Sequence, residues 1–206
     1  MATVTDAPVR LSEMRSMAQR LPHMLRSDAQ ENRDRILESA RTLVSERGID
    51  VAIREIARHA GVGPATLYRR FPTRHLLVEA VFADEMSACR KIVEDGCDEA
   101  DPWRGFCSVI ERTSVLSAEN HGFVDAFMAS GPDLDPVVAH RRALLRMISD
   151  LAHRAQAAGG LRADFVIDDF VLFVMAQRGL ASTPPAGREA AALRFAALII
   201  DGFRAR

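Results

Sequence analysis

The sequence predicts an all-α protein with a small N-terminal helical domain followed by a larger helical domain. Apolar residues recur at helical spacing in most segments, and no stretch sustains the alternation of apolar and polar residues that is typical of strands. Glycine and proline fall where helices of ordinary length would end. At 206 residues, with 48% hydrophobic and 27% charged residues, the chain is expected to fold as one large or two small domains.

The N-terminal part predicts an arm and one helix before the first glycine stop. Residues 1–28 are mixed polar and basic with prolines at 8 and 22, so we interpret them as a poorly ordered arm. From Asp28 the spacing becomes helical, and Gly48 suits the left-handed position that ends a helix. We place the domains at 1–28, 29–75 and 76–206. The expected inward-facing residues of this first helix are Ile36, Leu37, Ala40, Leu43 and Val44.

Next comes the run "AIREIARHAGVGPATLYRRFPTRHLL", residues 52–77, which predicts two short helices joined by a tight turn. Gly61 ends the first of them, and Pro64 fits the first position of the second, where a missing N–H costs nothing. Pro72 closes the second helix. Two helices joined by such a glycine-containing turn are the signature of a helix-turn-helix.

The remaining chain predicts further helices and no repeat. Proline or glycine bounds most of them, and the breaker "STPPAG" separates the last two. The stretch from residue 121 to 136 is expected to be broken around one short helix. The expected longer helices are Arg74 to about Glu94, Pro102 to about Ala118, Pro136 to Ala158, Asp168 to Ala181, and Arg188 to Phe203.

The second helix of the turn motif has one apolar and one polar face. Leu67 and Phe71 lie four residues apart and should pack inward, on Ile36, Val44, Ile56 and Leu76. Ala65, Thr66 and Arg69 then face outward, flanked by Tyr68 and Arg70. Alanine and threonine can contact thymine methyl groups, and arginine can bind guanine through two hydrogen bonds, so this face suits the DNA major groove.

Charge alone does not decide between DNA binding and a plain helical corner with a solvated basic edge. The net formal charge is −1, so affinity for nucleic acid would need a local patch. Residues 28–77 hold nine arginines and seven carboxylates, but no acid falls between Ala57 and Leu77. Arg54, Tyr68, Arg70 and Arg74 are placed where phosphate contacts would fix the register.

The run "ILESARTLVSERGIDVAIREIARHAGVGPATLYRRFPTRHLLVEAVF" resembles the DNA-binding domain of the tetracycline-repressor (TetR) family of bacterial transcription regulators. The resemblance implies base contacts by Ala65, Thr66 and Arg69. It implies phosphate contacts by Tyr68, Thr73, Arg74 and Arg54. Two positions depart from the family pattern. Ala52 stands where Thr or Ser usually begins the second helix, and Gly63-Pro64 replaces a frequent Ser or Lys.

Residues 154–176, "RAQAAGGLRADFVIDDFVLFVMA", resemble the C-terminal domain of an SbtR-like subgroup of that family. This resemblance implies a homodimer formed by the last two long helices and a small-molecule pocket among the middle helices. The residue pattern is consistent with such a dimer interface. Both C-terminal segments are apolar over more than one face, so each must be covered on two sides. A buried helix of a monomeric core is the alternative.

The predicted ligand pocket consists of apolar side chains with two polar anchors, His121 and Gln177. Pockets are mostly apolar with few polar groups, and methionine suits an adaptable wall. The apolar candidates for this pocket are Phe106, Ile110, Phe123, Phe127, Met128, Met147 and Phe173.

The function expected from the whole sequence is a repressor that binds a palindromic double-stranded DNA operator as a dimer and is released by a small-molecule effector.

Other functions are weaker interpretations of the sequence. No HExxH, CxxC, P-loop or GxSxG motif occurs, so we expect no enzyme, no metal and no cofactor. The odd number of cysteines favours a reduced, cytoplasmic protein, and neither a signal peptide nor a membrane span is expected. Two alternatives stay open: a redox-sensing regulator using Cys89, Cys97 or Cys107, and a helical adaptor that binds protein through its C-terminal helices.

Overall fold

The computed structural model describes residues 29–48, 50–128 and 136–206, without the side chains of residues 121, 126, 136, 181 and 182. Within these ranges the chain is helical, with no strand and a single isolated bridge between Leu161 and Arg204. The predicted all-α class is therefore confirmed. None of the described helices is both long and apolar enough to cross a membrane.

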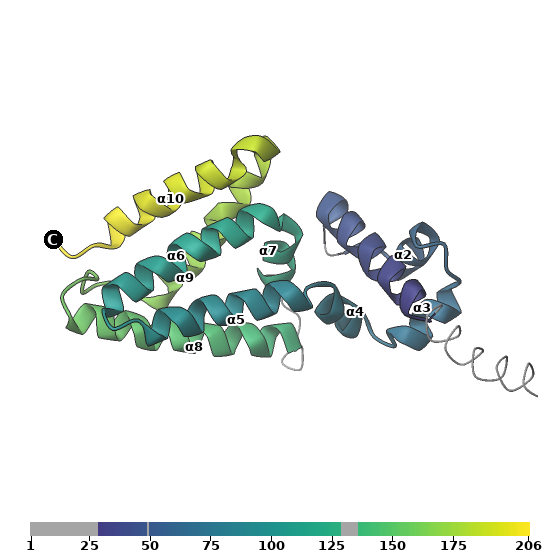
Figure 1. Cartoon of the computed structure of the whole chain (residues 1–206), viewed down its shortest axis with the longest axis horizontal. Helices are drawn as coiled ribbons and strands as arrows, with labels where there is room; N and C mark the ends of the chain where they lie inside the picture. The colour runs from purple at the N-terminus through teal and green to yellow at the C-terminus, as the bar shows by residue number, and fades with distance from the viewer. Residues whose placement is uncertain (1–28, 49, 129–135) are drawn as a thin grey trace, which may run out of the picture.

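The N-terminal unit contains three helices at one end of the molecule (Figure 1). Residues 29–47 are helical, and Gly48 follows with a φ of +84°, the left-handed conformation predicted for it. Helix α2 (Ile53–His59) and helix α3 (Pro64–Arg70) come next. Their shared core contains the inward residues predicted for the first helix, all of them buried: Ile36, Leu37, Ala40, Leu43 and Val44.

One predicted long helix is wrong. Instead of a single helix from Arg74 to Glu94, the chain forms α4 (Arg74–Val81) and α5 (Ala83–Asp98). Phe82 stands between them in a non-helical conformation, with φ −109° and ψ 19°, and its buried ring packs 5.7 Å from that of Phe123. The acidic pair Asp84 and Glu85 then lies in the first turn of α5, where a helix dipole favours negative charge.

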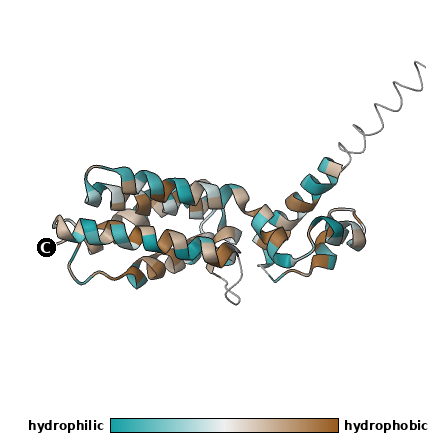
Figure 2. Cartoon of the chain, turned by 90° about the horizontal axis from the view of Figure 1, so that it is seen from below, coloured by the Kyte–Doolittle hydropathy of each residue, from teal (hydrophilic) through white to brown (hydrophobic). Residues whose placement is uncertain are grey.

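The larger unit is a bundle built around α6 (Pro102–Glu119), which packs against α5, α8 (Pro136–Ala157) and α10 (Arg188–Phe203). Helix α7 (His121–Met128) lies at the end of the bundle that faces the N-terminal unit (Figure 1). Hydrophobic and hydrophilic residues alternate along the helices of the bundle (Figure 2), and many of the hydrophobic ones are buried. This is the burial pattern expected of an amphipathic bundle.

The last predicted helices keep their places with one change. Helix α9 (Ile167–Ala176) is shorter than expected, because the chain tightens after Ala176 into the 3-10 helix η1 (Gln177–Ser182). A second short turn, η2 (Pro185–Gly187), contains the last three residues of the predicted breaker and leads directly into α10. Helix α10 has the predicted bounds.

Helices α5 and α6 touch backbone to backbone at Gly96 and Gly105. A Cβ added to Gly105 would stand 2.2 Å from the carbonyl oxygen of Gly96, and one added to Gly96 would stand 2.4 Å from a methyl group of Val109. Neither glycine can therefore be replaced without separating the two helices.

Candidate DNA-binding surface and effector cavity

The α2–α3 turn holds α3 on the N-terminal core. Gly61 adopts a φ of +66°, and the N–H of Val62 donates to the carbonyl oxygen of Ala57 at 3.0 Å, so the end of α2 is hydrogen-bonded into the turn. Leu67 is fully buried and Phe71 is 5% exposed, which confirms the predicted inward face of α3. Arg33 lies over the Phe71 ring, 5.9 Å from its centroid.

One predicted neighbour of this face is wrong. Leu76 was expected in the core but is 44% exposed, whereas Leu77 is buried. The reason is the start of α4 at Arg74, which sets the rotation of the helix so that position 77, and Val81 one turn on, point inward. The apolar side chain at position 76 is left on the surface.

Turned away from the core, the opposite face of α3 is open to solvent. Ala65, Arg69 and Arg70 are exposed, Tyr68 is 45% exposed, and Thr66 is half-buried. Arg54 in α2 is exposed as well. Within the described ranges, no ion pair involves Arg54, Arg69 or Arg70. These guanidinium groups are thus not neutralised by carboxylates of the described chain.

Two predicted phosphate ligands at the start of α4 also have structural roles. The Thr73 hydroxyl oxygen accepts the backbone N–H of Leu76 at 3.3 Å and so caps the helix, which leaves its own O–H able to donate. The Arg74 guanidinium donates to the carbonyl oxygen of Val51 at 2.9 Å. Arg74 therefore ties α4 to the segment that precedes α2, and its side chain is half-buried.

The starts of α2 and α3 have no side-chain caps. Ala52 and Gly63 occupy the two N-cap positions, and no side chain accepts a hydrogen bond there. Helix α2 is instead attached to the first helix by charge: Glu55 pairs with Arg47, and with Arg58 at 3.5 Å. Both departures from the family pattern thus lie at the ends of the helices that form the exposed basic face.

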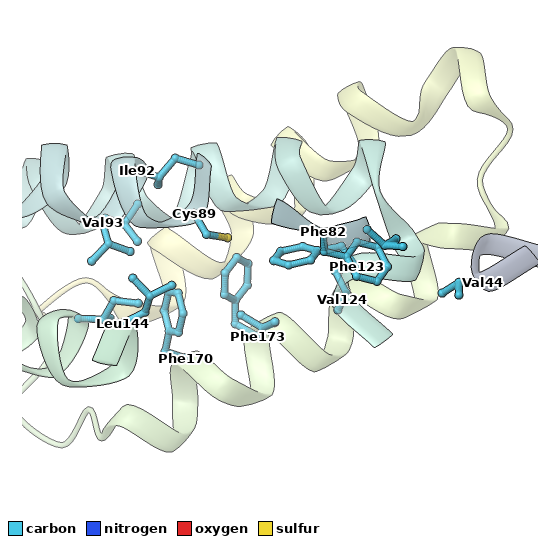
Figure 3. Packing of buried hydrophobic residues seen from close by; sticks show 14 of the residues in the cluster. Val44, Phe82, Cys89, Ile92, Val93, Phe123, Val124, Leu144, Phe170 and Phe173 are labelled. Atoms are coloured by element: carbon cyan, nitrogen blue, oxygen red, sulfur yellow. The ribbon is translucent and has the colours of Figure 1, made fainter. Parts of the chain in front are cut away.

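A cavity of about 310 Å³ lies between five helices of the larger unit. Figure 3 shows part of this region, with Cys89 and Val93 on one side and Phe123, Leu144 and Phe170 around it. The wall is mostly aliphatic and aromatic. Its lining residues are Cys89, Val93, Thr113, Ser117, Phe123, Val124, Phe127, Met128, Arg141, Leu144, Leu145, Ile148, Phe170, Val171 and Val174.

The predicted pocket residues divide into two groups. Phe123, Phe127 and Met128, all on α7, line the cavity. Phe106, Ile110, Met147, Phe173 and Gln177 do not belong to its lining. The side chain of His121 lies outside the described part of the chain.

Most of the five residues outside the lining belong to the core. Phe106 and Ile110 are fully buried on α6, and the Phe106 ring packs on Phe165 at 5.3 Å. Phe173 stacks against Phe195 of α10 at 6.0 Å. Gln177 is 3% exposed, and neither of its amide atoms has a hydrogen-bond partner in the described structure. Apolar residues at helical spacing can lie either in the core or in the cavity wall, and the spacing alone does not tell which.

Sequence reasoning missed Arg141, the one basic residue of the described cavity wall. Its Nη1 donates to the carbonyl oxygens of Phe127 and Met128, at 2.7 and 3.2 Å, so it holds the C-terminal end of α7. A signal was present. Arg141 shares one helical face with Leu144, Leu145 and Ile148, three, four and seven residues later.

The cysteines are poorly suited to redox chemistry. Burial raises the pKa of the Cys89 thiol to about 12, with a further contribution from Glu85. Burial, followed by Glu111, raises the pKa of Cys107 to about 11, and burial also raises the pKa of Cys97. The described residues contain no group of three or more His, Cys, Asp or Glu side chains placed to hold a metal.

Large apolar side chains remain exposed near the C-terminus. On α9 and the residue that precedes it, Val166, Leu172 and Met175 are 57%, 62% and 44% exposed. On α10, Leu193 and Leu198 are 43% and 55% exposed. The two apolar C-terminal helices therefore bury one face in the bundle and present another to the outside.

Comparison with known proteins gives two family matches that together cover most of the chain. Residues 36–81 match the model for bacterial regulatory proteins of the tetR family. Residues 101–205 match that of the transcriptional regulator SbtR-like, C-terminal domain. A solved TetR transcriptional regulator, SCO0520 from Streptomyces coelicolor, is 34% identical over 84% of this chain and 98% of that one, with a TM-score of 0.50.

Other relatives are shorter matches or more distant ones. The chain is 33% identical to an HTH-type transcriptional regulator of Mycobacterium bovis over 88 residues, 42% of this chain and 47% of the relative, so it spans about half the length of that protein. FadR from Bacillus subtilis, solved in complex with stearoyl-CoA, is 16% identical over 82% of this chain and 98% of that one, with a TM-score of 0.57.

The three-helix unit, the exposed arginines of α3 and the two family matches define a helix-turn-helix transcriptional regulator. The chain belongs to the TetR family, with an SbtR-like C-terminal domain.

Proposed function

We propose that this protein is a cytoplasmic transcriptional repressor that binds a palindromic operator as a homodimer and leaves it when a small molecule occupies the cavity. The observation that carries the proposal is the outward face of α3, where Arg69 and Arg70 are exposed on a stretch without carboxylates. A helix of this kind can enter the major groove, while the buried Leu67 and Phe71 keep it seated on the domain.

The exposed residues take two different roles in this proposal. Ala65, Thr66 and Arg69 read base edges, because they lie on the side of α3 opposite to its buried residues. The remaining contacts hold phosphates and set the register without reading sequence. They are made by Arg54, Tyr68, Arg70, Thr73 and Arg74.

Dimerisation uses the exposed apolar residues of α9 and α10. Leu172 and Leu198 are more than half exposed in the single chain, and covering them with the same residues of a second copy would remove this apolar surface from water. A dimer must hold two α3 helices about 34 Å apart to reach successive major grooves. In this proposal residues 29–75 bind DNA, and residues 76–206 bind the effector and the second copy. The predicted arm, residues 1–28, lies outside the described part of the chain.

Helix α7 provides a route from the cavity to the DNA-binding unit. Phe123 lines the cavity and packs on Phe82, the residue that separates α4 from α5. One residue earlier, Gly122 lies against the end of the first helix, since a Cβ at this position would be 3.4 Å from the backbone nitrogen of Ser45. A ligand that shifts α7 would thus alter the distance between the two α3 helices and favour the form that does not fit DNA.

Selection of binding sites from random DNA, followed by gel shifts, tests this function. We expect an inverted repeat, bound with an affinity that falls steeply with salt. Arg69→Ala should cost about 1–3 kcal/mol at one base pair of each half-site and relax the preference there. Arg70→Ala should weaken binding to all sequences alike and reduce the salt slope.

Arg70 is a better matched control than Arg74, because Arg74 also holds the backbone of the segment before α2. Equal losses on operator and random DNA for Arg69→Ala would contradict the base-reading role. The absence of any sequence-preferring, salt-sensitive binding by the wild-type chain would overturn the repressor proposal as a whole.

A further inference from the structure

The wall of the cavity carries almost no charge. Most of its side chains, such as Val93 and Leu144, offer only hydrocarbon surface, and its described lining contains no aspartate, glutamate, lysine or histidine. The Cys89 thiol is uncharged near neutral pH, because burial raises its pKa to about 12. Arg141 therefore carries the one charge of the described wall.

The Arg141 guanidinium is engaged within the protein. Its Nη1 donates to the carbonyl oxygens of Phe127 and Met128 at 2.7 and 3.2 Å, and Arg141 makes a further interaction besides these two hydrogen bonds. Both carbonyl oxygens lie at the C-terminal end of α7, where the helix dipole is negative and offsets part of the positive charge. A charged ligand would lose its hydration here without gaining an uncommitted counter-ion, and burial of a charge on those terms is costly.

Ser117 provides a buried hydroxyl in this apolar wall. Ser117 and Thr113 carry the two hydroxyl groups of the described lining, and Ser117, at 6% exposed, is the more buried of the two. Among the described residues, the Ser117 hydroxyl has no hydrogen-bond partner. A hydroxyl can both donate and accept, so an uncharged polar group on a ligand would remove the cost of leaving it unpaired.

The position of Ser117 links the cavity to α7. It lies in the last turn of α6, and α6 is held in place because it packs against α5, α8 and α10. Helix α7 begins directly after Asn120 and also packs against α6. Phe123 and Val124 of α7 line the same cavity, so a molecule bound to Ser117 would have its body against α7.

We propose that the effector is an uncharged, mainly hydrocarbon molecule with a hydroxyl or carbonyl group, and that this group forms a hydrogen bond with Ser117 in the cavity. The inference rests on the proposed function for its meaning as a signal, but not for the binding itself. An alkyl body and an aromatic body both suit a wall of aliphatic and phenyl side chains.

Calorimetry on the full-length protein without DNA, at neutral pH, tests the charge of the ligand. Octanol, octanoate and octylammonium share one alkyl body, while naphthol and naphthoate share one aromatic body. We expect at least one of the two alcohols to bind about 10-fold or more tightly than the charged molecules with the same body, because these must bury an unpaired charge. The alcohol that binds more tightly tells whether the natural body is alkyl or aromatic.

Two serines of α6 provide matched variants. Ser117→Ala should weaken the binding of the preferred alcohol by about 3- to 10-fold, the net contribution of one hydrogen bond between uncharged groups. Ser114 is also buried and its hydroxyl has no partner in the described structure, but it lies outside the lining. Ser114→Ala should therefore bind the alcohol like wild type. Naphthalene, which has no hydroxyl, should bind both variants and the wild type alike.

Thermal unfolding of both variants shows whether they are folded, and the wild-type comparison of the probes does not depend on any variant. Three results would overturn the inference: neither alcohol binds, a charged molecule binds as tightly as the alcohol with the same body, or Ser117→Ala loses no more affinity than Ser114→Ala.

The repressor proposal fails separately. A chain that binds an alcohol through Ser117 but binds no DNA keeps the ligand class and loses the proposed function. A chain that binds an operator but neither alcohol keeps the function and loses the ligand class.

Discussion

The exposed face of α3 and the cavity of the bundle differ in how the chain builds them. The residues of the α3 face come from one short stretch, between Arg54 and Arg74, held by a turn and a small core. The wall of the cavity comes from five helices, and its first and last residues, Cys89 and Val174, are far apart in the chain. A locally encoded surface can be found from spacing, whereas a surface assembled from distant segments needs the packing itself.

The strongest test of this difference concerns Phe106, which the sequence suggests as a pocket residue and the structure buries in the core. Phe106→Ala should lower the free energy of unfolding by about 3–5 kcal/mol, because it leaves a void among Phe165, Phe170 and Phe203. Phe127→Ala, in the cavity wall, should cost less stability and alter ligand affinity more. Urea unfolding and calorimetry measure the two effects.

Similar stability losses for the two variants would contradict the separation of core from cavity wall. The backbone carbonyl of Phe127 that accepts from Arg141 is kept in the alanine variant. A change in ligand affinity therefore reports the lost ring and not a lost anchor for the guanidinium.

A smaller effect is expected at the start of α2, where the locally encoded surface lacks its usual cap. Ala52→Thr should add a hydroxyl that accepts a backbone N–H of the first turn of α2. The gain should be about 1 kcal/mol in the free energy of unfolding. Ala52→Val, with the same shape but no hydroxyl, is the control and should show no gain.

The operator affinities of the Ala52→Thr and Ala52→Val variants provide a second measurement. If the hydroxyl also donates to a phosphate, Ala52→Thr binds the operator more tightly than Ala52→Val. Equal stability of the two variants would show that the missing cap does not limit α2.

The smallest effect is expected at the cysteines. Because the pKa of Cys89 is about 12 and that of Cys107 about 11, almost no thiolate exists near neutral pH, and the fraction rises only as the pH approaches those values. Operator binding should therefore be unchanged by peroxide in gel shifts, and iodoacetamide should label the native protein slowly. A peroxide-dependent loss of binding that disappears when all three cysteines are changed to serine would favour the redox-sensing alternative.

The sequence predicts the fold well where a single segment contains its own signals. Gly48 and Gly61 end helices with positive φ, Pro64 begins α3, and Leu67 and Phe71 lie inward as their spacing indicates. The break at Phe82 was not predicted, because an apolar residue fits both a continuous helix and a tertiary contact. Only the position of Phe123, forty-one residues later, decides between them.

For the cavity, the sequence predicts the chemistry of the wall better than its members. Phe123, Phe127 and Met128 line it, and they lie together on α7. Phe106 and Phe173 have the same residue type and spacing, but other helices cover them. Arg141 could be identified from the sequence, because it is a charged residue on the apolar face of a long helix. Such a charge indicates a site more strongly than a further phenylalanine on that face does.

The glycine contact between α5 and α6 has a mechanical consequence. Because Gly96 and Gly105 bring the two backbones together without side chains between them, this side of the cavity, including Cys89 and Thr113, resists being pushed apart. In the proposed function, a ligand would therefore displace the other side of the cavity, where α7 is short and its C-terminal end is held by Arg141 of α8. The α5–α6 pair would stay in place, and the proposed movement would fall on α7, which lies against the DNA-binding unit.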